Sequence, residues 1–233
     1  MFKWLRKLLI RLLIVCILVI GMCIGYGYIQ YRDTVALKPI EKKVSEYWGM
    51  EGYVVFEELN DDFVNAVVSV EDKRFFSRVG FDYIAFIRAM FTNVRYGTLE
   101  GGSTITQQVA KNLLFSQDTD VFQKISEVFV MFDMEELYTK EQIFALYVNM
   151  NYYGDGYWGI RQASLGYFGK KQSELTLAEA AILAGLPNAP SVFQLSTGFD
   201  LAKERQEAIL DSMVANGYIT EEEAEKAKLE ELK

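Results

Sequence analysis

Histidine is absent from all 233 residues of the chain. Its absence excludes Ser-His-Asp and Cys-His nucleophilic sites and most zinc sites, because each of them needs an imidazole. The sequence also contains no Ser-x-x-Lys, no Walker-type glycine loop and no Rossmann fingerprint, which excludes penicillin-sensitive acyl transfer and the common nucleotide sites. What remains is carboxylate chemistry assisted by Lys, amide and hydroxyl groups, and paired carboxylates are the usual apparatus of glycosyl transfer or hydrolysis.

Cysteine is scarce, since Cys16 and Cys23 are the only two and both lie inside a long apolar run. The rest of the chain can therefore form neither disulfides nor thiolate metal sites. Basic residues are in the minority, and the formal net charge is -8. An acidic chain is not expected to bind nucleic acid, and any anionic substrate must be held by locally placed cations.

Residues 12–29 form an uncharged run that is close to the minimum length for spanning a bilayer. Basic residues precede the run and Asp33 follows it, which predicts a cytoplasmic N-terminus over residues 1–11 and an external remainder. A cleaved signal peptide is the rival interpretation, but the run is long for one and no A-x-A-like site follows. We therefore expect a retained single-pass anchor, a tether over residues 30–55 and a domain over residues 56–233.

Most segments of the external part repeat apolar residues with the 3.6-residue period of a helix, so the domain is expected to be mainly α. Asp61 or Asp62 is expected to cap the first helix after the tether. Capping-box patterns at Thr139, Thr176 and Thr220 predict further helix starts. In the helix predicted around residues 121–138, the buried side is expected to carry Phe122, Ile125, Phe129 and Phe132.

Residues 101–112 (GGSTITQQVAKN) combine a glycine turn with a helix start. The glycines allow the backbone to approach a ligand closely, and Ser103 or Thr104 can cap the amides that follow. One face of the helix then carries a hydroxyl, two amides and one cation: Thr104, Gln107, Gln108 and Lys111. A solvated stripe with an N-cap is the plain interpretation, whereas the glycine turn and the single lysine favour a site for a polar, anionic ligand.

Three charged residues elsewhere are candidates for chemistry. Glu71 follows directly on the apolar face of a helix, where a carboxylate can serve as a general base, although a surface acid at a helix end gives the same pattern. Lys124 and Glu127 are i, i+3 neighbours in a very apolar helix. They form either a surface ion pair worth roughly a few tenths of a kcal/mol, or a cation and a second carboxylate that line a cleft.

Residues 82–97 predict a helix with more apolar and aromatic side chains than one core-facing stripe requires. Core packing is the default interpretation of such a helix. Because an anchor lies in the same chain, a surface that dips into the membrane interface is the competing interpretation.

Together these stretches resemble one known family. Residues 71–80 (EDKRFFSRVG) are similar to the E-D-x-x-F-x-x-H-x-G motif of the peptidoglycan glycosyltransferases, the family 51 transglycosylases, and residues 101–108 reproduce their second motif. Lys124-x-x-Glu127 resembles the end of their R-K-x-x-E motif, and residues 149–170 and 177–190 resemble the fourth and fifth motifs. The order and spacing agree from about residue 56 to the C-terminus.

The resemblance implies a lysozyme-like, two-lobed glycosyltransferase domain in its monofunctional, membrane-anchored biosynthetic form. It implies polymerisation of lipid II outside the bacterial cell membrane, with an undecaprenyl-pyrophosphate-linked glycan as donor and the GlcNAc 4-hydroxyl of lipid II as acceptor. One inverting displacement at C1 of the donor MurNAc gives a β-1,4 link, and no transpeptidation is implied. The implied partners are lipid II, the lipid-linked nascent glycan, the membrane and other cell-wall synthesis proteins, with no nucleic acid.

By position in the motifs, the resemblance makes Glu71 the general base and Glu127 the second acid. Glu127 would act through a divalent metal (Mg2+ or Mn2+) or through the cation cluster at the pyrophosphate, and no organic cofactor is implied. The aromatic helix of residues 81–91 would face the membrane and admit the lipid. Nine residues are expected to bind the sugar and the pyrophosphate: Arg74, Arg78, Ser103, Thr104, Gln107, Gln108, Lys111, Asn112 and Lys124.

Three positions depart from the family pattern. Arg78 stands where the first motif has His, Gln123 stands where the third motif has Arg, and the loop of residues 116–120 lacks a basic residue often found there. The last two departures remove positive charge from the expected donor side. Two rival functions stay open: a glycan-cleaving enzyme of lysozyme type, which has no use for a lysine cluster, and a non-catalytic membrane-anchored scaffold.

Overall fold

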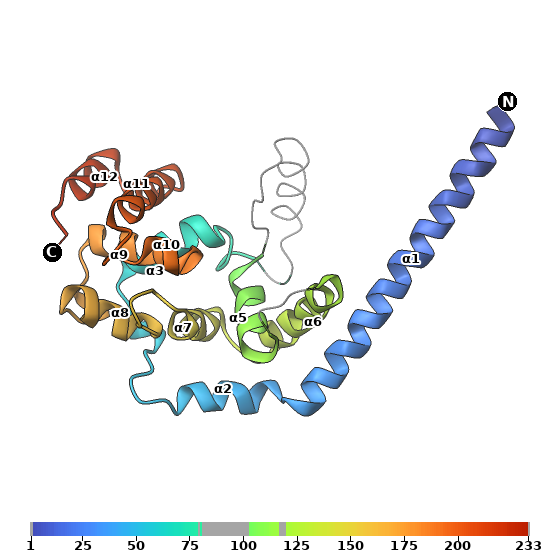
Figure 1. The fold of residues 1–233 in the computed structure, drawn as a ribbon, viewed down its shortest axis with the longest axis horizontal. Coiled ribbons are helices and arrows are strands. Elements are labelled where there is room, and N and C mark those ends of the chain that lie inside the picture. Colours follow the sequence, from blue (N-terminus) through green and yellow to red (C-terminus); the bar gives the residue numbers. More distant parts are fainter. Residues whose placement is uncertain (1, 79, 81–102, 117–119, 233) are drawn as a thin grey trace.

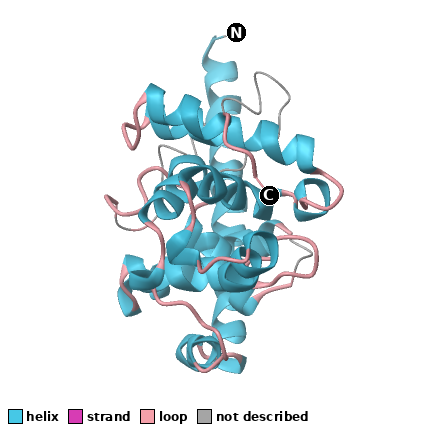
Figure 2. Ribbon diagram, turned by 90° about the vertical axis from the view of Figure 1, so that its left-hand side faces the viewer, coloured by secondary structure: helices cyan, strands magenta, loops and turns pink. Residues whose placement is uncertain are grey.

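The computed structural model describes residues 2–78, 80, 103–116 and 120–232. In these ranges the regular elements are helices joined by loops, and the only extended pairing is an isolated bridge between Tyr152 and Trp158 (Figures 1 and 2). The prediction of a mainly α domain is therefore confirmed. The helix predicted over residues 82–97 and most of the loop of residues 116–120 lie outside the described residues.

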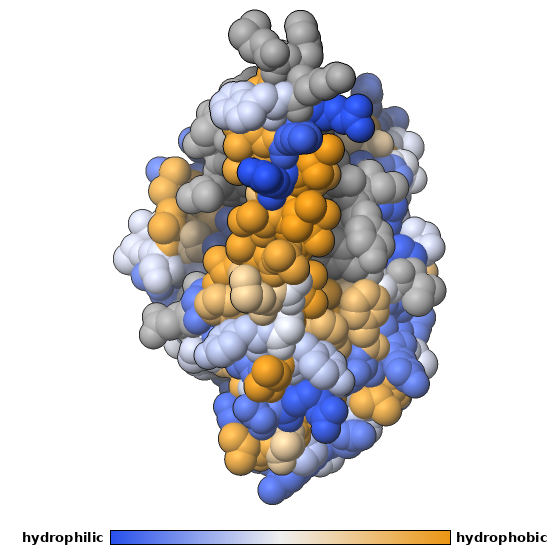
Figure 3. Space-filling view, turned by 90° about the vertical axis from the view of Figure 1, so that its right-hand side faces the viewer, coloured by the Kyte–Doolittle hydropathy of each residue, from blue (hydrophilic) through white to orange (hydrophobic). Residues whose placement is uncertain are grey.

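The chain begins with one long helix, α1 (Phe2–Leu37). Its segment Trp4–Leu37 is long and apolar enough to cross a membrane, and its most apolar window is not buried against the rest of the protein. In Figure 3 an orange band runs along this helix between the basic residues near its N-terminus and the polar residues lower down. The predicted anchor, residues 12–29, lies inside α1.

Residues 30–55, the expected tether, are largely helical. Residues 30–37 continue α1, because no proline interrupts the helix before Pro39, which precedes α2 (Ile40–Trp48). Ile40, Val44 and Val54 are buried in the main core. The expected tether is thus packed against the domain.

The lower part of α1 is fastened to α6 (Val121–Leu137). The Ser126 hydroxyl donates a 2.8 Å hydrogen bond to the carbonyl of Gly27, and the Tyr31 hydroxyl donates a 2.6 Å bond to Asp133 Oδ2. These contacts overturn the expected buried side of α6. Of the four apolar residues assigned to it, Phe122, Ile125 and Phe129 contact α1, and Phe132 is 43% exposed.

Glu127, Val130, Met131 and Met134 turn into the domain instead. The apolar period predicts the helix, but the sequence does not show that α1 covers one of its apolar faces. The consequence is that the face that carries Glu127 is the one packed into the domain.

The described helices of the domain form two groups on either side of α7 (Lys140–Met150), which lies at the centre in Figure 1. Helix α5 packs against α2, α6 and α7 in one group, while α3, α11 and α12 pack around α9 in the other. Helix α8 (Gly159–Phe168) contacts both α7 and α9. The remaining bounds are η1 (Phe56–Glu58), α3 (Asp61–Glu71), α5 (Ile105–Leu114), η2 (Gln172–Glu174), α9 (Leu177–Gly185), η3 (Leu186–Asn188), α10 (Pro190–Phe193), α11 (Phe199–Ala215) and α12 (Glu221–Lys228).

Helix caps follow the sequence closely. The expected capping boxes at Thr139, Thr176 and Thr220 are present, each with both reciprocal hydrogen bonds. The cap of α3 is different, because Asn60 and not Asp61 or Asp62 accepts the bond from the Phe63 amide. Asn60 has the extended backbone that an N-cap requires, whereas both aspartates already lie in the first helical turn.

Candidate active site

A cleft of about 770 Å³ opens between the two helix groups. Side chains from α3, α5, α6, α7, η3 and α11 meet there, although they are far apart in the sequence. The cleft is lined by Val70, Glu71, Ser103, Gln108, Lys111, Asn112, Lys124, Tyr147, Pro187, Asn188 and Arg205. The structure therefore brings together six of the residues predicted for the site: Glu71, Ser103, Gln108, Lys111, Asn112 and Lys124.

Glu71 is the last residue of α3 and faces this cleft. The side-chain amide of Gln108 donates a 2.7 Å hydrogen bond to Glu71 Oε2 and so fixes the orientation of the carboxylate. Tyr147 lies on the same wall, where burial raises the pKa of its hydroxyl well above the usual value and the nearby charge of Glu71 adds to that shift. Tyr147 is thus a neutral hydrogen-bond donor beside a carboxylate.

Lys124 and Glu127 are paired, as their spacing predicts, but only the lysine lines the cleft. The Lys124 side chain is 45% exposed and its Nζ lies 2.7 Å from Glu127 Oε2, while the Glu127 side chain is fully buried. The other oxygen, Oε1, accepts a 3.1 Å bond from Gln123. Glu127 therefore acts on the cleft through the position of Lys124, and Gln123 supports the same carboxylate from the position where the family motif has Arg.

Of the two roles expected for Glu127, through a divalent metal or through the cation cluster, its contacts favour the second. A lysine ammonium and a glutamine amide already occupy both carboxylate oxygens. Within the described ranges, no three side chains of His, Cys, Asp or Glu gather in a way that could hold a metal ion. The residues around Glu127 suit a cation of the protein itself.

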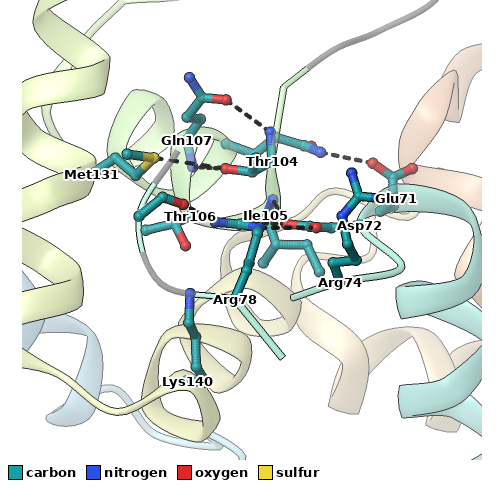
Figure 4. A network of polar contacts seen from close by, with 12 residues as sticks. Glu71, Asp72, Arg74, Arg78, Thr104, Ile105, Thr106, Gln107, Met131 and Lys140 are labelled. Atoms are coloured by element: carbon teal, nitrogen blue, oxygen red, sulfur yellow. Dashed lines mark hydrogen bonds and ion pairs between the residues drawn. The ribbon is translucent and has the colours of Figure 1, made fainter. Parts of the chain in front are cut away.

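A second set of charges, which we call the buried ionic network, consists of Asp72, Arg78, Glu135 and Lys140. Figure 4 labels three of them, Asp72, Arg78 and Lys140. The Arg78 guanidinium donates to the Asp72 carboxylate and lies 3.5 Å from Glu135 Oε1, which is 2.6 Å from Lys140 Nζ. The Arg78 side chain is only 10% exposed. Arg78 was expected to bind the pyrophosphate, but the structure places it in this network and away from the lining of the cleft.

This network holds the start of α5. Asp72 Oδ2 accepts a 3.3 Å bond from the Ile105 amide, and Glu135 Oε1 accepts a 2.7 Å bond from the Thr106 hydroxyl. Burial opposes ionisation of Glu135, but hydrogen bonds from Lys140, Thr106 and the Gly80 amide outweigh it and lower the pKa of Glu135. Burial, together with the charge of Arg78, lowers the pKa of Lys140 despite its pairing with Glu135.

Three other predicted ligands also lie outside the cleft lining. Thr104 and Gln107 are buried and form a capping box, in which each side chain accepts a bond from the other's backbone amide. The predicted cap at the start of α5 is thereby confirmed at Thr104. Arg74 is half-buried and is not among the residues that line the cleft.

Arg205 is a third cation of the cleft that the sequence did not single out. It lies in α11, a helix rich in Lys, Glu and Asp, so no local signal distinguishes it from its charged neighbours. Its Nε is buried and has no hydrogen-bond partner in the described part of the chain. An unsatisfied buried donor beside an open cleft is suited to an anionic ligand.

Comparisons with known proteins agree with this geometry. A sequence profile of the family described as transglycosylase matches residues 39–214. A putative transglycosylase from Cupriavidus necator is 40% identical over 78% of this chain and 78% of its own length. Penicillin-binding protein 2a from Streptococcus pneumoniae is 38% identical over 82% of this chain and 26% of its own length, and penicillin-binding protein 1A from Vibrio cholerae is 32% identical over 98% and 30%.

The matched region contains every described residue that lines the cleft. The chain spans between about a quarter and a third of the length of the two penicillin-binding proteins, so the similarity concerns one part of those molecules. In contrast, it spans most of the putative transglycosylase.

Proposed function

Because the chain belongs to the transglycosylase family, the family 51 peptidoglycan glycosyltransferases, we propose that it polymerises the glycan of peptidoglycan from lipid II. The donor is a glycan chain linked to undecaprenyl pyrophosphate, and the acceptor is the GlcNAc 4-hydroxyl of lipid II. The observation that supports this proposal best is the cleft itself, in which one carboxylate, Glu71, faces three cations, Lys111, Lys124 and Arg205. A hydrolase of lysozyme type needs a protonated acid and has no use for a cluster of cations.

Glu71 is the general base of the proposed reaction. Its carboxylate removes the proton of the acceptor 4-hydroxyl while that oxygen attacks C1 of the donor MurNAc. The C1–O bond to the pyrophosphate breaks in the same displacement, the configuration at C1 inverts, and a β-1,4 link forms. The bond from Gln108 to Glu71 Oε2 holds the carboxylate in one orientation and leaves Oε1 for the hydroxyl proton.

The three cations stabilise the leaving pyrophosphate. Negative charge builds up on its oxygens as the C1–O bond breaks, and fixed ammonium and guanidinium groups stabilise that charge without reorganising. Lys124 is held by the buried carboxylate of Glu127, which makes Glu127 a positioning residue in this proposal. Ser103 and Asn112 supply neutral hydrogen bonds along the same wall.

Helix α1 anchors the enzyme in the membrane that contains its lipid-linked substrates. The basic residues near its start favour a cytoplasmic N-terminus and a catalytic domain on the opposite side of the membrane. The chain contains no Ser-x-x-Lys motif, so these residues provide no penicillin-reactive serine for a transpeptidation step.

The proposal is tested by giving the purified full chain in detergent two substrates, lipid II and finished peptidoglycan. We expect glycan polymers from lipid II, resolved by gel electrophoresis, and no soluble fragments from peptidoglycan. Release of fragments without polymerisation would assign the chain to the lysozyme-type hydrolases, and inactivity on both substrates would favour a scaffold. A parallel reaction with a metal chelator tests whether a metal held by Glu127 is required. If Glu127 acts only through Lys124, polymerisation should continue in the presence of the chelator.

A further inference from the structure

A second depression lies on the other side of α7 from the cleft, and we call it the aromatic groove. Its volume is about 580 Å³, and its lining includes Trp48, Tyr53, Val55 and Phe56 together with the carboxylates of Glu57 and Glu141. Trp48 packs edge-to-face with Tyr138 and is still 44% exposed, so part of its surface is available in the groove. A pocket of this size accommodates a few residues of a peptide.

Helix α7 separates the groove from the cleft. Gln142 and Ala145 line the groove, whereas Tyr147 lines the cleft. At roughly 100° per residue, Tyr147 points about 140° away from Gln142 and about 160° away from Ala145 around the helix axis. A molecule bound in the groove would therefore leave the surroundings of Glu71 free.

The charge of the groove has one sign. Neither Glu57 nor Glu141 forms an ion pair within the described ranges, and no Lys or Arg is among the described residues that line the groove. Residues 44–72, which build most of it, contain eight acidic residues and no Lys or Arg. Unpaired carboxylates beside exposed aromatic faces are the surroundings that bind a cation best.

The groove also offers one unused hydrogen-bond donor. Burial raises the pKa of Tyr53 to about 12, so its hydroxyl keeps its proton. That hydroxyl is buried, and the Trp48 side chain lies close enough to donate to its oxygen. No acceptor for its own proton is present in the described part of the chain. A peptide carbonyl is a suitable acceptor for it, whereas a bare metal ion or a simple ammonium ion is not.

We propose that the aromatic groove binds a segment of a partner protein on the same side of the membrane as the catalytic domain, through one Lys or Arg side chain flanked by apolar residues. The cationic group lies against Trp48 between Glu57 and Glu141. The apolar neighbours contact Val55 and Phe56, and a backbone carbonyl accepts the bond from Tyr53. This site is separate from the proposed reaction and does not depend on it.

The test uses Trp48 as its own reporter. The chain has three tryptophans, and Trp4 and Trp158 are exposed, so the Trp4→Phe/Trp158→Phe protein keeps its fold and fluoresces from Trp48 alone. The probes are three peptides, acetyl-Ser-Leu-Arg-Leu-Ser amide and its versions with norleucine or Glu in place of Arg. We expect a saturable change of Trp48 fluorescence with the Arg peptide, and an affinity at least about fivefold lower for the norleucine peptide.

Two variants examine the carboxylates in the same reporter protein. Glu57→Gln/Glu141→Gln should lower the affinity for the Arg peptide several-fold and leave the rate of lipid II polymerisation unchanged. Glu58→Gln is the matched control, because Glu58 is an exposed acid of the same segment that does not line the groove, and it should bind the Arg peptide like the parent.

The proposal is overturned if no saturable signal appears, if the norleucine peptide binds as well as the Arg peptide, or if the double variant binds like the control. A Trp48 spectrum that changes with protein concentration in the absence of peptide would instead assign the groove to a second copy of this chain. Each of these results leaves the polymerisation assay unaffected, so failure here is distinguishable from failure of the proposed function.

Discussion

Glu71 and Asp72 are neighbours in the chain, but their carboxylates belong to two different clusters of charge. Glu71 faces the open cleft with Lys111, Lys124 and Arg205. Asp72 is buried and belongs to the buried ionic network with Arg78, Glu135 and Lys140. Helix α3 ends between the two residues, since Glu71 is its last residue and the backbone leaves the helix at Asp72. This change of backbone direction places the two side chains in different surroundings.

The two clusters differ in where the opposite charge for each group comes from. In the buried ionic network, each cation lies within ion-pair distance of a carboxylate of the protein itself. Among the described residues that line the cleft, three cations face one carboxylate, and of these cations only Lys124 has a carboxylate partner, Glu127. Lys111 and Arg205 therefore suit an anion from outside. Residues of the network are therefore expected to act mainly on stability, and residues of the cleft mainly on activity.

The largest expected effect is on stability, for Arg78→Met. It leaves the buried carboxylate of Asp72 without its cation, and breaking a buried pair in this way costs about 3–5 kcal/mol of unfolding free energy. Chemical unfolding of the detergent-solubilised protein, followed by circular dichroism, measures the loss. Lys43→Met is the control, because Lys43 pairs with Glu46 at the surface and should change stability by less than about 1 kcal/mol. Equal stabilities of the two variants would contradict the structural role of Arg78.

Lys111→Met should have the opposite profile. Removing one cation that stabilises the leaving group is expected to slow polymerisation by about 10²–10³-fold, or about 2.7–4 kcal/mol in the barrier. The unfolding free energy should stay close to that of the wild type, since Lys111 makes no ion pair in the described ranges. Initial rates of lipid II polymerisation compare Lys111→Met with the wild type. Lys73→Met is the control, because Lys73 is exposed and does not line the cleft. If Lys111→Met lost as much unfolding free energy as Arg78→Met, the division between a cluster for activity and a cluster for stability would be contradicted.

Thr104→Ala should have a smaller effect, confined to stability. The Thr104 hydroxyl caps α5, and loss of such a cap costs about 1 kcal/mol. Thr104→Ser keeps the capping oxygen and should restore the wild-type midpoint of thermal unfolding. A KM for lipid II that rises strongly in Thr104→Ala, with unchanged stability, would return Thr104 to the substrate ligands.

The smallest effect is the pH dependence of stability that comes from Glu135. Hydrogen bonds lower the pKa of Glu135 in the folded state, so the unfolded state binds its proton at higher pH. This contribution is fully present above the unfolded pKa of about 4.3 and is lost as the pH falls through the lowered folded value. Unfolding curves between pH 6 and 3 should therefore fall less steeply for Glu135→Gln than for the wild type. Parallel curves would show that Glu135 carries no such linkage.

Much of the fold followed from local patterns. The capping boxes at Thr139, Thr176 and Thr220 and the long apolar helix at the N-terminus depend only on neighbouring residues, and the structure confirms them. The direction in which each apolar face of α6 packs did not follow from local patterns. The sequence cannot show that α1 covers Phe122 and Phe129.

The site followed the same division. Glu71, Gln108 and Lys111 lie in recognisable motifs, and the structure brings them together in the cleft. Arg205 arrives from a distant helix whose other charges are ordinary surface residues, so only the packing of α11 identifies it. Arg78 has the charge of a pyrophosphate ligand, and only its burial against Asp72 and Glu135 shows another role.

The role of Glu71 as the base of glycan polymerisation is tested most directly by the initial rate at which the Glu71→Gln protein polymerises lipid II. Glutamine keeps the size of the side chain and can still bond with Gln108, so the fold should be retained while the rate falls by at least about 10²–10⁴-fold. The neighbouring Asp72→Asn provides the contrast, since it should lose stability. A Glu71→Gln protein that polymerises lipid II at nearly the wild-type rate would contradict the assignment.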